Sequence, residues 1–160
     1  MKICGVDPGI HGGLAIVDII DGATPRLIDA VDIPTVGTGA KERVDSIALA
    51  AWIKSHQPDH AMIERAQAMP KQGASSGFKF GRAAGAIEAT IACSGIPITV
   101  IEPSFWKKHH GLLGQRGDKE ASRQRALQLF PTGHDLLARK KDHGRAEAML
   151  IALTFNGRTG

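Results

Sequence analysis

Two short apolar segments that each end in an acidic residue restrict the possible folds of this chain most strongly. Lys2–Asp7 (KICGVD) and His60–Glu64 (HAMIE) have the length and composition of buried strands. Pro8-Gly9 ends the first segment directly after Asp7. Acids at the carboxyl ends of strands lie at the rim of a sheet, where α/β proteins place their sites. The pattern therefore predicts a sheet with two carboxylates at its rim, which lie close together if the two strands are neighbours.

The rest of the hydrophobic pattern predicts further strands and helices around these two segments. We expect strands at 12–20, 26–33 and 96–101, helices at 41–56, 78–93, 104–110, 118–129 and 145–155, and a mobile loop at 65–77. Asp21-Gly22 is typical of a hairpin turn, so the first three strands form an antiparallel meander. The helix expected at 78–93 is rich in Ala and contains Gly81 and Gly85, whose lack of a side chain predicts close packing on the sheet. The order predicts one domain over residues 1–160, an α/β fold with a mixed β-sheet, leading antiparallel strands and flanking helices.

The charges are unevenly distributed along the chain. Residues 1–64 hold 5 Lys and Arg against 9 Asp and Glu, whereas residues 65–145 hold 14 against 6. This distribution is expected of a basic, polyanion-binding face beside an acidic site, although charge alone slightly favours a solvated surface of helices rich in Lys and Arg.

Neither a membrane segment nor a secretion signal is evident in the sequence. No apolar run approaches the roughly 20 residues of a membrane helix. The N-terminal segment MKICGVDPG does not have the pattern of a signal peptide. We therefore expect a cytoplasmic protein in which Cys4 and Cys93 are reduced, buried thiols.

A third group of polar residues lies near the end of the chain, in KKDHGRAEA. His143 and Glu147 are four residues apart, so on a helix they share one face. Asp142 suits either a helix cap or a metal ligand. Together with Asp7 and Glu64, these carboxylates form a set able to hold Mg²⁺, which prefers oxygen ligands and retains water for substrate phosphates. Hydrolysis of a phosphodiester by two metal ions needs such a set from several elements.

These segments resemble the RuvC-type Holliday junction resolvases and their phage relatives over about residues 1–155. GVDPGIHGG is similar to the first acidic strand and turn of that family, and AMIERAQAMP to its second acidic strand. FKFGRAAGAIEA is similar to the helix that follows, and KKDHGRAEAMLIAL to the acidic C-terminal helix in its phage-like variant with Glu. The resemblance implies an RNase H-like fold and a homodimer that cuts two strands of branched DNA symmetrically.

The resemblance also implies roles for individual residues. Asp7, Glu64 and Glu147 match metal-binding carboxylates, and Lys107 and Lys119 match basic residues that contact the scissile region. Mg²⁺ is the expected metal, with Mn²⁺ as a possible substitute. The residues expected to contact DNA phosphates are Lys71, Lys79, Arg82, Lys107, Lys108, Arg116, Lys119, Arg123 and Arg125.

The sequence departs from the family pattern at two positions. Bacterial members commonly have an aromatic residue three positions after the second acid, and here that position is Gln67, so Met69 or the surrounding loop would have to open the junction. The last two ligands of the family usually lie three residues apart, and three before Glu147 is Gly144. Asp142, His143 or both must then supply the fourth ligand, with Asp142 on the metal and His143 tuning the site as the favoured hypothesis.

Three other functions compete with junction resolution. One is an RNase H-like or flap-type nuclease without junction preference, and another is a non-catalytic DNA-binding module of the same fold. The third is a nucleotide-binding protein of the actin and sugar-kinase type, in which Asp-Gly turns hold phosphates. Those folds need two such domains, and 160 residues are too few for them.

Overall fold

Five strands form one mixed sheet in the computed structural model, which describes residues 1–67, 73–114 and 119–156. The sheet order is β3-β2-β1-β6-β7. The strands are β1 (Lys2–Asp7), β2 (Gly13–Asp18), β3 (Arg26–Asp32), β6 (His60–Glu64) and β7 (Ile98–Ile101). β1, β2 and β3 form an antiparallel meander, whereas β6 lies parallel to β1 and β7 parallel to β6. The predicted mixed sheet with leading antiparallel strands is therefore confirmed.

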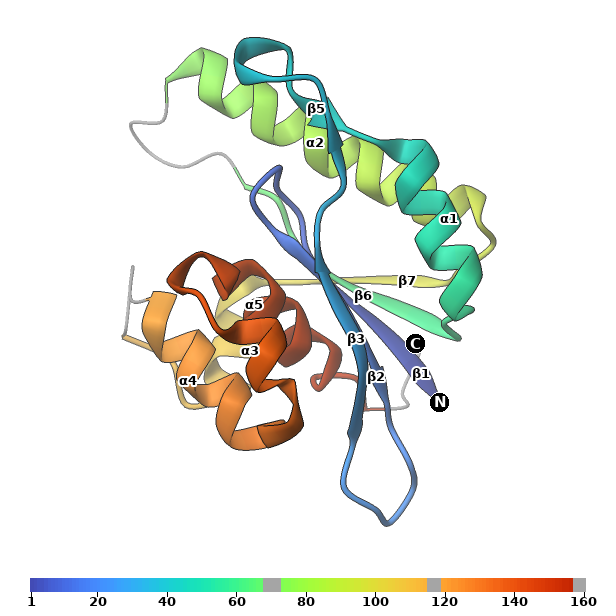
Figure 1. The fold of residues 1–160 in the computed structure, drawn as a ribbon, viewed down its shortest axis with the longest axis vertical. Helices are drawn as coiled ribbons and strands as arrows, with labels where there is room; N and C mark the ends of the chain where they lie inside the picture. Colours follow the sequence, from blue (N-terminus) through green and yellow to red (C-terminus); the bar gives the residue numbers. More distant parts are fainter. Residues whose placement is uncertain (68–72, 115–118, 157–160) are drawn as a thin grey trace.

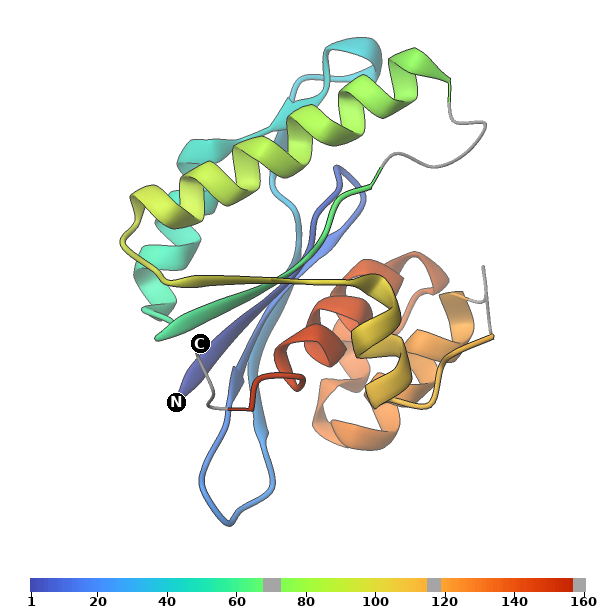
Figure 2. The ribbon, with the colours of Figure 1, turned by 180° about the vertical axis from the view of Figure 1, so that it is seen from behind.

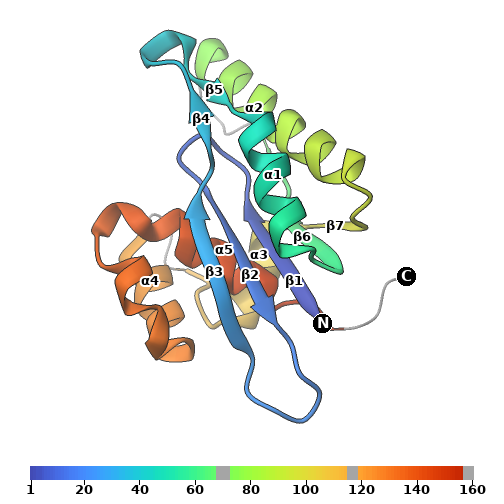
Figure 3. The same ribbon diagram turned by 45° about the vertical axis from the view of Figure 1, so that its right-hand side comes forward.

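Helices cover both faces of this sheet (Figures 1 and 2). α1 (Ser46–His56) and α2 (Ala74–Cys93) lie on one face, and α3 (Pro103–His109), α4 (Lys119–Leu129) and α5 (His143–Ala152) lie on the other. Short 3-10 segments occupy Gly39–Lys41, Pro131–Leu137 and Lys140–Asp142. Figure 3 shows β4 (Thr35–Val36) and β5 (Arg43–Val44) extending beyond the main sheet beside α2.

Successive side chains of β1 point to opposite faces of the sheet. Ile3 packs into the core beneath α5, whereas Cys4 and Val6 pack into the core beneath α1 and α2. Gly5 faces α5, because a Cβ built on it would overlap the carbonyl oxygen of Ala148. Asp7 is next on that side, so the two-residue period of the strand directs its carboxylate toward α5.

The same alternation directs Glu64 to the α5 side. Met62 of β6 lies in the core beneath α5, while Ala61 and Ile63 lie in the opposite core. In the parallel pairing of β1 and β6, Val6 is aligned with Ile63. The next residues, Asp7 and Glu64, therefore end two adjacent strands. The two acid-terminated strands are therefore neighbours, which was the condition for their carboxylates to lie close together.

Glycines let α5 lie unusually close to β1 and β2. A Cβ on Gly5 would also lie 2.7 Å from the amide nitrogen of Ala152, and one on Gly13 would lie 2.5 Å from that of Arg145. From the helix side, a Cβ on Gly144 would lie 2.7 Å from the carbonyl carbon of Gly12. Side chains are therefore excluded on both sides of this contact, and the helix backbone rests almost directly on the strands.

Several predicted boundaries and orientations differ from the structure. The helix expected from residue 41 begins at Ser46, because Asp45 accepts hydrogen bonds from the amides of Ile47 and Ala48 and caps it. Residues 43–44 are strand β5 instead. Ile47 is 85% exposed despite being apolar, because the buried face of α1 runs through Leu49 and Ile53.

The predicted role of two glycines in α2 was also wrong. A Cβ at Gly81 or Gly85 would meet nothing within 4 Å, so neither allows close packing on the sheet. The helix packs inward through Ala83, Ile87 and Ile91, one residue per turn.

The two cysteines do not share one environment. Cys4 is buried, and this burial raises the pKa of its thiol to about 12. Cys93 is exposed, so the expectation of a buried thiol was wrong for that residue, which lies at the open C-terminal end of α2.

Within the residues that the structure describes, no helix is both long and apolar enough to cross a membrane. The predicted loop at 65–77 lies partly outside the described residues, and its last part, from Ala74, is the first turn of α2.

Replacing Gly5 by alanine is expected to destabilise the protein strongly, because the new methyl group would overlap the backbone of α5. We expect a loss of about 3 kcal/mol in the free energy of unfolding, near the upper end for overpacking. Gly9→Ala is a matched control, since its Cβ would make an ordinary contact of 3.5 Å with the Phe80 ring. Urea unfolding of both variants measures the difference, and equal stability would contradict this account of the packing.

Candidate active site at the edge of the sheet

Three acidic side chains from separate elements meet where β1 and β6 end. Asp7 ends β1, Glu64 ends β6, and Glu147 lies in the first half of α5. All three are half-buried, and the charges of Glu147 and Glu64 both act on Asp7. The structure thus brings together the three carboxylates that the sequence suggested.

The pKa values of these carboxyl groups reflect their crowding. Burial raises the pKa of Asp7 well above its usual value, and the negative charges of Glu147 and Glu64 raise it further. Burial likewise raises the pKa of Glu64 and that of Glu147. Like charges held together in a low dielectric disfavour ionisation, so this cluster needs positive charge nearby to be fully ionised.

Two lysines supply part of that positive charge. Lys107 of α3 lowers the pKa values of Asp7, Glu64 and Glu147, while Lys119 at the start of α4 lowers those of Asp7 and Glu147. The ammonium of Lys107 also lies 5.2 Å from the centre of the Trp106 ring. Both lysines predicted for the site therefore lie beside the acids.

Trp106 is a site residue that the sequence did not reveal. Its indole, fully buried, donates a hydrogen bond of 2.5 Å from Nε1 to Oε2 of Glu64. In the sequence, only its position one residue before Lys107 could have suggested a role in the site. Ser122 of α4 makes a comparable contact, donating from Oγ to Oε1 of Glu147 at 3.2 Å.

Asp142 does not join this group. It is 1% exposed, and its carboxylate accepts hydrogen bonds from the backbone amide of Arg139 and from its guanidinium, with the closest ion-pair contact at 2.6 Å. Burial acts to raise the pKa of Asp142, but the bonds from Arg139 outweigh it and hold that pKa below its ordinary value. Its oxygens are thus committed to closing the turn before α5.

His143 shares one charged neighbour, Lys119, with the acidic cluster. It is the first residue of α5, one turn before Glu147, and the charge of Lys119 acts on both side chains. Burial lowers the pKa of His143, and Lys119 lowers it further, which favours a neutral imidazole. Its Nδ1 faces the carbonyl oxygen of Lys140 at 3.4 Å.

The structure gives a reason for the glycine three residues before Glu147. At Gly144, a Cβ would lie within 2.9 Å of the backbone of both His11 and Gly12. A carboxylate ligand at this position would therefore require the turn after β1 to move away from α5. The departure from the family pattern follows from the close contact between this helix and the turn.

The segment after Glu64 is fixed to the start of α3. Arg65 forms an ion pair with Glu102 through Nε and Oε1, and Gln67 donates from Nε2 to Oε2 of the same residue, both at 2.5 Å. Gln67, at the family's aromatic position, is thus held beside the site by a polar contact. Met69 lies outside the described residues.

The residues predicted to bind DNA lie in different settings. Lys79, Arg82, Lys108 and Lys119 are exposed, and Lys107 and Arg125 are half-buried. Arg123 is engaged within the protein, since it pairs with Glu120 at 2.5 Å and donates to the carbonyl oxygen of Leu137. Lys71 and Arg116 lie outside the described residues.

The three carboxylates act on one another, but they are not spaced as a complete set of metal ligands. Among the residues with a described placement, no three His, Cys, Asp or Glu side chains are grouped so as to hold an ion. The donor set nevertheless fits a hard divalent cation, because it consists of carboxylate oxygens whose mutual repulsion a cation would relieve.

Comparison with known proteins agrees with this geometry. The family described as "Crossover junction endodeoxyribonuclease RuvC" matches residues 3–155. The chain belongs to the RuvC family. A RuvC of Paenarthrobacter aurescens is 28% identical over 167 residues, which cover 100% of this chain and 83% of that protein. A RuvC of Nitratidesulfovibrio vulgaris is 32% identical over 124 residues, covering 75% of this chain and 72% of the relative.

A solved structure supports the fold independently. The chain is similar to Thermus thermophilus RuvC in complex with a Holliday junction substrate, with a TM-score of 0.68, 22% identity, and coverage of 96% of this chain and 92% of that one. This similarity confirms the predicted RNase H-like fold. Both sequence relatives are bacterial, so the assignment to a phage-like branch of the RuvC family stays a prediction.

Removing one charge from the acidic cluster is expected to stabilise the protein. Because the folded state raises the pKa of Asp7, it binds the proton more strongly than the unfolded chain, and stability falls as the pH rises through the raised pKa. Asp7→Asn should therefore raise the melting temperature at neutral pH by a few degrees, since each kcal/mol is worth about 2–4 °C at this size. The gain should disappear at a pH below the ordinary carboxyl pKa.

Asp18→Asn is the matched control for that measurement. Asp18 also ends a strand, but it pairs with Arg26 and with the N-terminal ammonium. Its replacement should leave the melting temperature unchanged or lower it. If Asp7→Asn behaves like Asp18→Asn in a thermal melt followed across pH, crowding of the cluster is not a source of instability.

Trp106→Phe tests whether the indole positions Glu64. Without the Nε1 donor the pKa of Glu64 should rise further, so the acid limb of the pH–rate profile should move to higher pH. We expect a fall in cleavage of about tenfold, from the ~1.5 kcal/mol of a hydrogen bond to a charged group. Trp52→Phe is the control, because that indole donates to Asp29 at 3.1 Å on the opposite face of the sheet. Equal profiles for the two variants would assign Trp106 to packing alone.

Proposed function

We propose that this RuvC-family chain is a metal-dependent endonuclease that hydrolyses phosphodiester bonds of branched DNA and resolves Holliday junctions. One observation carries the proposal: Asp7, Glu64 and Glu147 converge beside Lys107 and Lys119 at the edge of an RNase H-like sheet. Family membership and the names of the bacterial relatives support the substrate class.

Asp7, Glu64 and Glu147 are the residues that would hold the metal, with Mg²⁺ as the expected ion and Mn²⁺ as a substitute. Bound there, divalent cations would supply an activated water and stabilise the leaving oxygen. Trp106 and Ser122 orient two of the carboxylates through their hydrogen bonds. Asp142 then contributes indirectly, because its bonds to Arg139 fix the start of the helix that carries Glu147.

The basic side chains have a different task in this proposal. Lys107 and Lys119 contact the phosphates next to the scissile bond, where their charge offsets that of the acids and of the transition state. A neutral His143, one turn from Glu147, is placed to move a proton at this end of the site. Further phosphate contacts come from Lys79, Arg82, Lys108 and Arg125, and such contacts position DNA without reading its sequence.

A symmetric homodimer suits a substrate with two equivalent strands to cut. The outer side of α2 is the proposed contact, because Gly81, Gly85 and Ala89 are exposed and small enough for another helix to approach. Ala84 of the same helix is buried within its own protomer, so it is not available to a second copy. A cytoplasmic location is proposed as well, supported by free thiols at Cys4 and Cys93.

A nuclease without junction preference is the second candidate. Gln67 stands at the family's aromatic position and is held by Glu102. A polar side chain fixed in this way is poorly suited to open stacked bases at a crossover. The same catalytic chemistry would then act on flaps or other branched DNA.

Cleavage of a four-way junction beside a linear duplex of the same sequence, with Mg²⁺, Mn²⁺ or EDTA, tests the proposal. Metal-dependent, symmetric cutting of the junction is expected. Glu64→Gln should lower the rate by more than roughly 100-fold, the upper range for disturbing even the outer partners of a metal site. Its junction binding in EDTA should remain near that of wild type, while Asp18→Asn should cut normally.

Other outcomes separate the alternatives. Equal cutting of the duplex favours the nuclease without junction preference, and binding without cutting in any metal favours a non-catalytic module. Sedimentation of the same preparations tests the dimer, since a monomer at micromolar concentration with and without DNA would remove that claim.

A further inference from the structure

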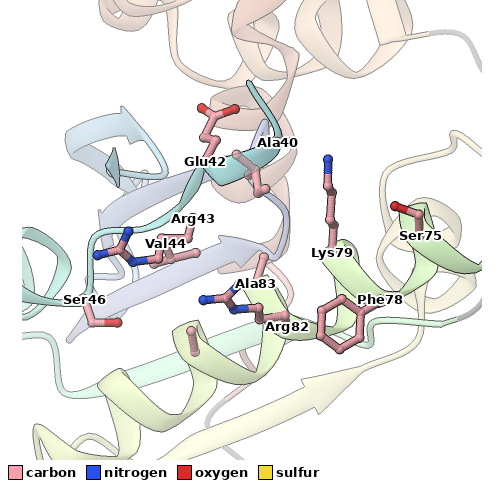
Figure 4. Close-up of a pocket in the computed structure, with 12 residues that line it drawn as sticks. Ala40, Glu42, Arg43, Val44, Ser46, Ser75, Phe78, Lys79, Arg82 and Ala83 are labelled. Atoms are coloured by element: carbon pink, nitrogen blue, oxygen red, sulfur yellow. The ribbon is translucent and has the colours of Figure 1, made fainter. Parts of the chain in front are cut away.

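A groove lies outside the acidic cluster, between the β4–β5 segment and the first half of α2. Its volume is about 300 Å³. Ala40, Arg43 and Val44 line it from the β5 side, and Lys79 and Arg82 line it from α2 (Figure 4). Two elements that are about 35 residues apart in sequence thus form the walls of one surface feature.

The charge of this groove is mostly positive and lacks compensation. Arg43, Lys79 and Arg82 are exposed, and within residues 1–67, 73–114 and 119–156 none of them forms an ion pair with a carboxylate. Glu42 is the one acid among the described lining residues, and it accepts a hydrogen bond from Thr35 at 3.1 Å. Its carboxylate points away from both arginines in Figure 4.

The start of α2 adds to the positive potential on this side. Gly73 is the N-cap residue and has no side chain to accept bonds from the first-turn amides, and Ser75 of that turn lines the groove. The amides in the first turn of a helix carry partial positive charge. This partial charge adds to the full charges of Arg43, Lys79 and Arg82, which supply most of the positive potential.

The groove adjoins the end of the sheet that holds the acids. Ile10, three residues after Asp7 in the turn between β1 and β2, is part of its lining. Gly9 of the same turn lies against the Phe80 ring of α2. The turn between β1 and β2 therefore connects the two features. Asp7 of the acidic cluster directly precedes it, and Ile10 within it lines the basic groove.

The shape of the groove favours a chain of phosphates over a single small anion. Figure 4 shows the charged ends of Lys79 and Arg82 pointing in different directions, so one phosphate would not meet both. The volume is too small for a duplex but suits part of one backbone at its edge. An extended polyanion would contact all three cations in sequence.

We infer that this groove binds the sugar-phosphate backbone of a duplex arm of the DNA whose scissile strand lies at the acidic cluster. The inference rests on the proposed nuclease function and adds to it a second contact region, which includes Arg43 from the acidic first part of the chain. Contacts of this kind position the arm and strengthen binding through counterion release.

The double variant Arg43→Gln with Arg82→Gln tests the groove. Its control is Arg26→Gln with Lys54→Gln, which removes the same charge from the β2–β3 hairpin and from α1. Binding is measured by fluorescence anisotropy in EDTA over a range of salt, on junctions with long arms, junctions with arms truncated near the crossover, and a linear duplex. On long arms the salt slope should fall by about 1.8, at about 0.9 per phosphate contact, while the control retains the wild-type slope.

Arm length and charge-preserving variants sharpen the result. Truncated arms should abolish the difference between wild type and the double variant, because the backbone no longer reaches the groove. Arg43→Lys with Arg82→Lys should bind long arms nearly as well as wild type, since phosphate attraction needs the charge. A double variant that matches the control on every DNA overturns the inference.

Two further outcomes are decisive. If inorganic phosphate or a nucleoside monophosphate shifts the groove resonances in NMR while the double variant binds DNA normally, the groove is a small-anion site and the inference fails. The proposed function is judged separately, by wild-type cleavage of the junction in Mg²⁺. Should wild type cut no junction and the double variant still lose affinity for the linear duplex, the groove remains a DNA contact and only the proposed function falls.

Discussion

The close contact between α5 and the first two strands is the constraint on which the site depends. Gly5 and Gly13 on the strands and Gly144 on the helix leave no side chains between the two backbones. The helix therefore lies near enough for Glu147 to act on Asp7, although α5 follows β1 by more than a hundred residues. Protein interiors are closely packed, so a methyl group at any of these positions would move the helix and the carboxylate with it.

The electrostatics of the site follow from this packing. Burial raises the pKa values of all three carboxylates, neighbouring acids raise those of Asp7 and Glu64 further, and the nearby lysines only partly compensate. Such an arrangement lowers the stability of the folded protein and suits a site whose charge balance a bound cation completes. Asp142, by contrast, is fully paired with Arg139, which explains why an acid so near in sequence has a different role.

Patterns with a short period were sufficient to predict the sheet and two of its acids. Lys2–Asp7 and His60–Glu64 were identified because a short apolar run that ends in a carboxylate indicates a buried strand with an acid at the rim of the sheet. Trp106 was missed because its hydrogen bond to Glu64 joins residues 42 positions apart, and nothing local indicates such a partner. Gly81 and Gly85 were misjudged for a related reason: a glycine allows close approach, but only the tertiary structure determines whether anything approaches.

The distribution of charge along the sequence shows the same limit. The first 64 residues are acidic overall, so sequence alone placed the basic surface after them. The fold, however, carries Arg43 on β5 to the side of α2, where it joins Lys79 and Arg82. It also turns the chain after Asp7, so that Ile10 lines the basic groove while Asp7 faces α5. A single turn therefore separates the acidic cluster, which repels phosphate until a cation neutralises it, from the basic groove, which attracts phosphate. DNA bound in the groove is thereby brought to the acidic cluster.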